Sequence, residues 1–126
     1  MTYSIIHVKG VKVMADKDLI ESMIVELRRG TQILLVLDAL SESQYGYSLL
    51  QKLESRGVLI EAGTLYPLLR RLDAQGLLES SWDTSESRPR KYYQLNKKGH
   101  TTLKALKNTW LTIVKEMNQL FEEDQQ

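Results

Sequence analysis

The stretch AGTLYPLLRRLDAQG, residues 62–76, decides the fold. Its leucines recur at spacings of three and four, which places them on one stripe of a helix. We expect this helix to run from Ala62 to about Gln75 and to stop at Gly76, because glycine suits the left-handed conformation beyond a helix end. The stripe predicted to be buried consists of Leu65, Leu68, Leu69 and Leu72.

The opposite face of this helix carries an unusual set of side chains. A solvated face normally carries Glu, Lys and Gln, whereas this one combines small, hydroxyl, aromatic, proline and guanidinium groups. Such groups suit a DNA groove, because hydroxyls and guanidiniums bind phosphates or base edges and a proline ring can press on a thymine methyl. The alternative is that Tyr66 and Pro67 are local core and helix-start residues. The candidate DNA-contacting residues are Gly63, Thr64, Tyr66, Pro67, Arg70 and Arg71.

The residues that precede this helix predict further helical structure. Residues 16–39 follow helical spacing, and Gly30 is expected to divide them into two helices. Another helix is expected from about Tyr45 to Arg56, with its end at Gly57. Its predicted buried residues are Leu49, Leu50 and Leu53.

After Gly76 the hydrophobic period changes to two. Residues 77–82 and 90–95 therefore predict two strands, and the polar residues 83–89 predict the turn between them. Helices followed by a hairpin are the order of the winged helix-turn-helix, in which the hairpin is the wing. We therefore predict a mainly α fold with one β-hairpin.

The predicted wing is basic and aromatic. Arg88, Arg90 and Lys91 cluster where a hairpin tip would reach the DNA backbone or the minor groove. Solvated basic loops are also common, so this cluster is weaker evidence than the helix face. Tyr92 and Tyr93 should point to opposite faces, one packing on Trp82 or the head and the other covering a phosphate or the helix base.

Residues 97–123 predict one long helix with an apolar seam. Spacings that alternate between three and four are typical of the a and d positions of a coiled coil, so we expect a homodimer. Part of the helix could instead pack on Leu19, Met23 and Leu27, because Leu111, Val114 and Phe121 widen the stripe. A third possibility is that it only closes its own core. The candidate dimerisation residues are Leu103, Leu106, Trp110, Ile113, Met117 and Leu120.

The length and composition are those of one small domain. The chain has 126 residues and no cysteine, and it shows no export leader and no apolar run near the roughly 20 residues that span a bilayer. These features favour a cytoplasmic protein that does not enter a membrane. The net charge is +1, but residues 28–100 carry eleven Lys and Arg against eight Asp and Glu. The basic excess therefore lies in the predicted DNA-binding part.

The first residues differ from the rest. Residues 1–13 are rich in β-branched residues and predict a short extended segment. One hypothesis is that the native start is Met14 and that the preceding residues are an upstream extension; the alternative is an ordinary arm or edge strand. The expected organisation is an extension at 1–15, a winged helix-turn-helix at 16–96 and a dimerisation helix at 97–126.

Nothing in the sequence favours catalysis. His7 and His100 are its two histidines, His100 is expected to face solvent, and no set of metal ligands or nucleophile with base stands out. We therefore expect no enzyme activity, no metal site and no cofactor.

Four motifs resemble the PadR-like transcription regulators, with a resemblance that covers about residues 27–121. They are YGY at 45–47, GTLYPLLRRL at 63–72, GLL at 76–78 and PRKYYQL at 89–95. The resemblance implies a winged helix dimer that represses promoters and often senses phenolic acids, drugs or other aromatic molecules. It also adds Tyr45 to the candidate DNA-contacting residues.

The single C-terminal helix resembles the smaller branch of that family. There a Trp on this helix stacks on planar ligands at the dimer centre, and Trp110 is the matching residue. Trp110 is equally well explained as an anchor of the dimer core. The sequence departs from the family at the wing tip, which lacks glycines, and in the first 27 residues, which have no counterpart.

The sequence therefore predicts a repressor whose two heads sit about 34 Å apart on a pseudo-palindromic operator in double-stranded DNA. A small aromatic effector at Trp110 would release it. The competing hypothesis is a winged-helix module that binds proteins and has lost DNA binding, because a fold does not fix a function.

Overall fold

The computed structural model describes residues 5–8, 11–14 and 16–124. Contacts within the chain divide it into two compact units, residues 1–33 and residues 34–126. The first unit contains a hairpin of β1 (Ile5–Val8) and β2 (Val11–Met14), with Ile5 opposite Met14. The extended structure predicted there is confirmed for the described residues, and the start at Met14 stays a hypothesis.

Helix α1 (Asp16–Ala39) begins in the first unit and ends in the second. It is continuous through Gly30, so the predicted division into two helices was wrong. A glycine in a helix interior weakens the helix by only about 1 kcal/mol and removes no backbone hydrogen bond. The Thr31 hydroxyl also donates a hydrogen bond to the carbonyl oxygen of Arg28 at 2.8 Å, within the same helix.

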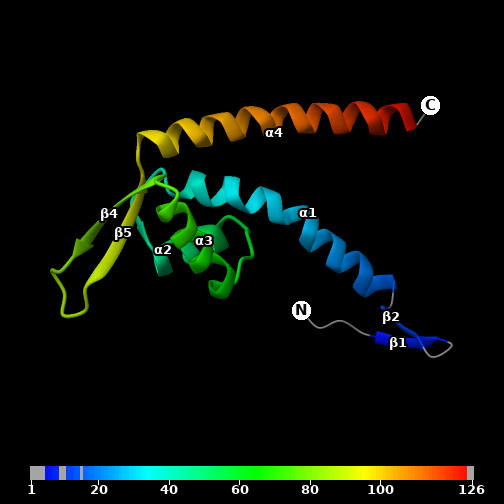
Figure 1. Ribbon diagram of the computed structural model, residues 1–126, viewed down its shortest axis with the longest axis horizontal. Coiled ribbons are helices and arrows are strands. Elements are labelled where there is room, and N and C mark those ends of the chain that lie inside the picture. The colour runs from blue at the N-terminus through cyan, green and yellow to red at the C-terminus, as the bar shows by residue number, and fades with distance from the viewer. Residues whose placement is uncertain (1–4, 9–10, 15, 125–126) are drawn as a thin grey trace. The chain divides into compact units, whose positions relative to one another are not determined.

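The second unit holds a helical head, a wing and a long helix (Figure 1). After the end of α1 its elements are β3 (Gln44–Tyr45), α2 (Gly46–Ser55), α3 (Ala62–Ala74), β4 (Leu78–Asp83), β5 (Arg90–Leu95) and α4 (Lys97–Asp124). This order is that of a winged helix-turn-helix, with β4 and β5 as the wing. Within the described residues, no helix combines the length and the apolar character that crossing a membrane requires.

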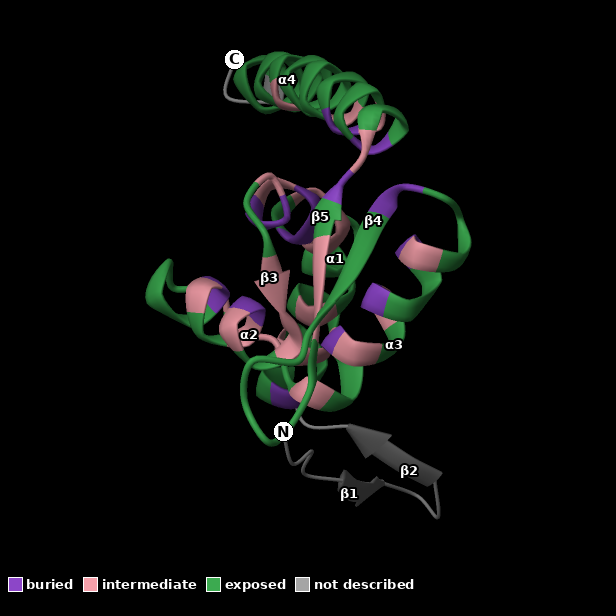
Figure 2. Cartoon of the chain, turned by 90° about the vertical axis from the view of Figure 1, so that its left-hand side faces the viewer, coloured by how far each residue is buried: buried purple, intermediate pink, exposed green. Residues whose placement is uncertain are grey.

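The core of this unit lies between the end of α1, the inner faces of α2 and α3 and the base of the wing (Figure 2). Leu50 and Leu68 were expected in it but are only half-buried. Each follows or precedes a buried leucine by one residue, which turns it about 100° around the helix. The buried apolar residues of the unit are Val36, Leu37, Ala39, Leu40, Leu49, Leu53, Leu65, Leu69, Leu72, Leu77, Leu78, Leu95 and Leu103.

Two glycines end the helices of the head as predicted. Gly57 and Gly76 both have φ +78°, in the region that side chains disfavour. The amide of Gly57 donates to the carbonyl of Glu54 at 2.9 Å, and that of Gly76 to Asp73 at 3.0 Å. These turns fix where α2 stops and where the wing begins.

The wing belongs to a three-stranded antiparallel sheet of order β3-β5-β4. Leu78 lies opposite Leu95 at its base, and Asp83 lies opposite Arg90 near its tip. Strand β3 was not predicted, because Tyr45 had been assigned to the start of a helix and Gln44 to no element. They pair with β5 instead, Tyr45 opposite Tyr92, and α2 starts one residue later.

Candidate nucleic-acid interface

Helix α3 presents the face that the sequence predicted. Its apolar stripe holds it to the core, since Leu65, Leu69 and Leu72 are each at most 5% exposed. The opposite side leaves five of the six candidate residues exposed: Gly63, Thr64, Pro67, Arg70 and Arg71.

Pro67 lies inside α3 rather than at its start. A proline there has no N–H for the carbonyl four residues earlier, which is that of Gly63. The helix continues through this position because its buried leucines on both sides are held by the core. The exposed side of the first turns therefore combines a missing side chain at Gly63, the Thr64 hydroxyl and an apolar ring at Pro67, and a surface can approach the backbone closely there.

Tyr66 is the candidate on this helix that is half-buried. Its ring packs against the start of α2, where a Cβ on Gly46 would lie 3.0 Å from the Tyr66 ring carbon Cε1. This position agrees with the alternative that Tyr66 is a local packing residue. Its ring sets the contact between α2 and α3, and its assignment as a DNA contact stays a prediction.

Arg70 and Arg71 form the basic end of the exposed face. Neither guanidinium has a hydrogen bond or an ion pair with another residue in the part of the chain that the structure describes. An unpaired guanidinium on a rigid helix keeps all its donors available for phosphate or guanine. These two side chains are therefore the strongest anion-binding groups of the helix.

The wing cations differ from one another in their contacts. Arg88 is exposed and, like the helix arginines, has no hydrogen bond or ion pair in the described residues. The guanidinium of Arg90 lies 4.7 Å from the centre of the Tyr45 ring, and its Nη2 is 3.7 Å from a carboxylate oxygen of Glu86. The charge interaction with Tyr45, followed by that with Glu86, raises the pKa of Arg90. Arg90 is therefore already engaged within its own chain.

Lys91 is engaged as well. Its ammonium lies 3.9 Å from a carboxylate oxygen of Asp73 on α3 and 5.3 Å from the centre of the Tyr93 ring. The contact with Asp73 links the wing to the end of α3. Sequence reasoning missed both acidic partners. Glu86 stands four residues before Arg90, a spacing that pairs side chains on a helix but not in a wing loop, and Asp73 is remote in sequence.

The aromatic residues of the wing base meet the head at Tyr45. The rings of Tyr45 and Tyr92 pack edge to face, with centres 5.3 Å apart and planes at 67°. This confirms the prediction that one of the two wing tyrosines packs on the head. Trp82 does not take part in that contact and is 64% exposed.

The wing tip forms a side-chain-closed turn without glycine. The side-chain oxygen Oδ1 of Asp83 accepts hydrogen bonds from the backbone N–H of Ser85 at 2.9 Å and from its hydroxyl at 2.6 Å. An Asp side chain that binds the backbone two residues on closes a turn in this way. The two bonds from Ser85 lower the pKa of Asp83.

The residues predicted for dimerisation fall into two groups. Leu103 is buried in the core of its own chain, and Leu106 is half-buried. Beyond them the seam is open to solvent, although its residues are large and apolar. Trp110 is 41% exposed, and the others are Ile113, Met117 and Leu120 at 39%, 47% and 54%.

No three His, Asp or Glu side chains are placed to hold a metal ion within the described residues. The chemistry of the unit is that of cations, hydroxyls and aromatic rings along α3 and the wing.

Comparisons with known proteins agree on one family. A model of the transcriptional regulator PadR-like family matches residues 33–105, more than half of the chain. The transcriptional regulator Rv3488 of Mycobacterium tuberculosis is 34% identical over 79 residues, which make up 62% of this chain and 74% of that protein.

Solved structures show the same relation. A PadR family transcriptional regulator from Eggerthella lenta is 46% identical, with a TM-score of 0.80 over 84% of this chain and 95% of that one. A PadR-like regulator from Bacillus cereus is 31% identical, with a TM-score of 0.67 over 76% of this chain and 96% of that one. With the winged helix-turn-helix described above, these matches show that the chain belongs to the PadR-like family of transcriptional regulators.

Proposed function

We propose that this protein is a sequence-specific DNA-binding repressor that acts as a homodimer on a pseudo-palindromic operator. The observation that carries the proposal is the exposed face of α3, where Arg70 and Arg71 have no partner in the described residues and stand beside a small, a hydroxyl and a proline residue. A helix that presents such groups from a buried leucine stripe suits the major groove.

The residues have separate roles in this proposal. Gly63 allows close approach, and Thr64 and Pro67 meet base edges or a thymine methyl. Arg70 and Arg71 hold phosphates or guanine, and Arg88 leads the contact of the wing with the backbone. Tyr45 and Tyr66 shape the surface by packing.

The apolar seam of α4 supports the homodimer. Helix α4 leaves the head at the end of β5, and beyond Leu106 its described residues are exposed, apart from the half-buried Val114. A row of large apolar side chains at coiled-coil spacing is costly to leave in water and is satisfied by a second copy of the same helix. We therefore assign Trp110, Ile113, Met117 and Leu120 to the dimer contact.

A small aromatic effector is the proposed inducer. A Trp on the dimer seam offers a planar apolar surface to each protomer, and Trp110 is partly exposed in the single chain. Titration of planar aromatic compounds should quench its fluorescence, and Trp110→Phe should remove the response while Trp82 still emits. If the dimer forms but no aromatic compound quenches the fluorescence, Trp110 serves only to pack the dimer contact.

Gel mobility shift with the DNA upstream of the protein's own gene tests the proposal. We expect the wild-type chain to bind at low salt and the double variant R70Q/R71Q to lose binding. The matched control is K104Q/K115Q, which removes the same charge from two exposed lysines of α4. Equal weakening in both variants would mean a general charge effect, and no binding by the wild type would favour the protein-interaction module.

A further inference from the structure

Helix α4 is fixed to the head at its first turn. The Asn96 side chain accepts from the backbone N–H of Gly99 at 2.8 Å and donates to the carbonyl oxygen of Gly76 at 2.8 Å. It therefore caps α4 and binds the turn that follows α3 with the same group. A Cβ on Gly99 would collide with the carbonyl oxygen of Leu77, so the helix start and this turn are in close contact.

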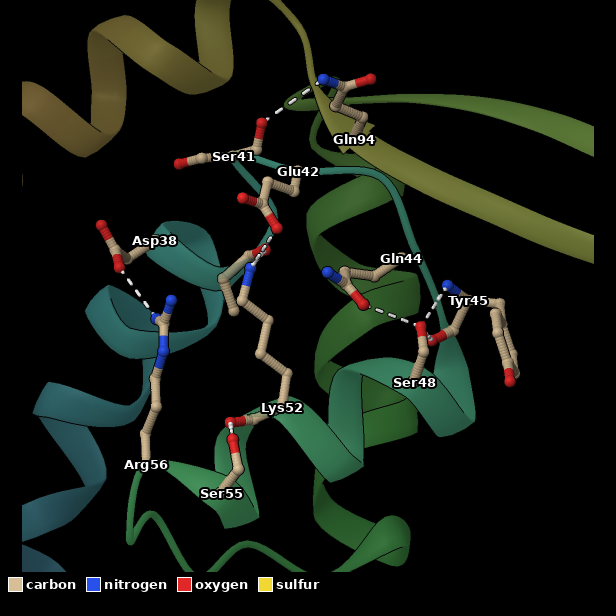
Figure 3. Close-up of polar contacts among 11 residues, drawn as sticks. Asp38, Ser41, Glu42, Gln44, Tyr45, Ser48, Lys52, Ser55, Arg56 and Gln94 are labelled. Atoms are coloured by element: carbon tan, nitrogen blue, oxygen red, sulfur yellow. Dashed lines mark hydrogen bonds and ion pairs between the residues drawn. The ribbon is translucent and has the colours of Figure 1, made fainter.

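A second attachment lies eleven residues along the helix, about 16 Å at 1.5 Å per residue. The ammonium of Lys107 is 2.8 Å from one carboxylate oxygen of Asp38, near the end of α1. The other carboxylate oxygen of Asp38 accepts from the guanidinium of Arg56, at the end of α2, at 3.1 Å. Figure 3 shows the Asp38–Arg56 half of this contact, beside the separate Lys52–Glu42 pair. One carboxylate thus joins α4 to α2.

The position of Asp38 is unfavourable without these partners. It is the second-last residue of α1, and a negative charge at the C-terminal end of a helix opposes the helix dipole. Lys107, followed by Arg56, holds its pKa below the ordinary value of 3.8, against the effect of partial burial. Lys107 and Arg56 therefore stabilise the charged carboxylate at a place where the helix alone disfavours it.

Lys107 is the last residue of α4 with a polar side-chain contact to another element in the described chain. Attachment at the first turn alone leaves a helix free to swing about that point, whereas a second attachment further along fixes its direction. Between the two attachments the buried Leu103 and the half-buried Leu106 pack against the head, and Lys107 adds a polar contact at the far end of this packed stretch.

We propose that Asp38 is a positioning residue that sets the direction of α4 relative to the helix-turn-helix, and with it the separation of the two recognition helices in the dimer. The second half of this statement rests on the proposed DNA-binding function; the first half does not. The contact with Arg56 matters because Arg56 begins the short segment, residues 56–61, that joins α2 to α3.

The direction of α4 can be measured without DNA. The chain has no cysteine, so Gln51→Cys on α2 and Lys115→Cys on α4 accept spin labels at these two exposed positions alone. Mixing with an excess of unlabelled chain places both labels of a pair in one protomer. Pulsed electron paramagnetic resonance should give a narrow distribution of distances between the two labels in the otherwise wild-type chain. The distribution should broaden or shift when D38N or K107Q is added.

The matched control is E42Q, which removes the 2.9 Å ion pair between Glu42 and Lys52 inside the head. It should leave the distances unchanged. The double variant D38N/K107Q should resemble D38N, because D38N already removes the Lys107 contact. Circular dichroism verifies that each variant is folded. A D38N distribution that superimposes on the wild type, or an equal change in E42Q, would overturn the proposal.

The effect of Asp38 on the separation of the two recognition helices is tested with operators whose half-sites are moved apart in steps of one base pair. The preference of the wild type for its best spacing should fall at least about threefold in D38N, because each protomer loses the partly exposed ion pairs of Asp38 with Lys107 and Arg56. It should persist in E42Q. If no variant binds DNA, the proposed function fails while the distance measurement still decides the role of Asp38. Altered distances with an unchanged spacing preference would overturn the link between Asp38 and the separation of the heads.

Discussion

The wing and helix cations should differ in how much each contributes to the salt dependence of DNA binding. Arg70, Arg71 and Arg88 are free of partners in the described residues, whereas Arg90 and Lys91 already lie beside Glu86 and Asp73. A free cation that meets a phosphate releases a DNA counterion. A cation that is already paired must give up its carboxylate partner to meet a phosphate, and that carboxylate then needs a counterion of its own. Its net release of counterions is therefore smaller.

The magnitude follows from the number of free cations. Three in each protomer make six in the dimer, and a slope of about −0.9 per phosphate predicts log K falling by about 5 for each unit of log salt concentration. Raising salt about fourfold should then weaken binding roughly a thousandfold. If all five cations of each protomer acted fully, the slope would be about −9 and the loss about 10⁵-fold.

The assay is fluorescence anisotropy of a labelled operator over a series of salt concentrations. R88Q should reduce the slope by about 2, because it removes one free cation from each protomer. R90Q and K91Q should reduce it by clearly less, even where affinity falls through loss of the packing at Tyr45 or the contact with Asp73. Slopes that drop equally for R88Q and R90Q would refute the reasoning that intrachain pairing decides the contribution.

Three further predictions concern the scaffold. Gly99→Ala should destabilise the protein by about 1–3 kcal/mol in thermal unfolding, because its Cβ meets the backbone at Leu77. Gly30→Ala has open space around it and should be neutral or stabilise by up to about 1 kcal/mol. A Gly30→Ala variant less stable than Gly99→Ala would contradict the contact at Leu77. Met117→Glu should give monomers in analytical ultracentrifugation and Lys115→Glu should not, and equal behaviour would argue against the seam. Asp38→Asn should lower stability by no more than about 1 kcal/mol at neutral pH. Because the folded-state pKa of Asp38 is depressed, this deficit should shrink as the pH falls below 3.8, and a deficit that grows there would show another cause.

Much of the fold was predictable because its signals are local. The leucine stripe of α3, the stops at Gly57 and Gly76 and the change to period two after Gly76 each depend on neighbouring residues. The break expected at Gly30 was wrong because a glycine lowers the stability of a helix without forcing it to end, and the following residues Val36 and Leu37 are held in the core. Local preference was overridden there by packing.

The contacts of the site were less predictable because they join residues remote in sequence. The exposed face of α3 followed from helical periodicity, but the Lys91–Asp73 contact and the Arg90–Tyr45 stacking depend on how the wing folds against the head. The two-residue strand β3 is too short to give a periodic pattern. Leu103 fits the coiled-coil spacing as well as its neighbours do, and only the three-dimensional packing shows that it belongs to its own head.

The central claim is that two copies of α3 read one stretch of DNA. Hydroxyl-radical footprinting of the wild-type protein on the DNA upstream of its gene tests this most directly. We predict two protected patches whose centres lie about one duplex turn, roughly 34 Å, apart, and their loss in R70Q/R71Q but not in K104Q/K115Q. A single patch, no protection at low salt, or protection that survives in R70Q/R71Q would contradict it.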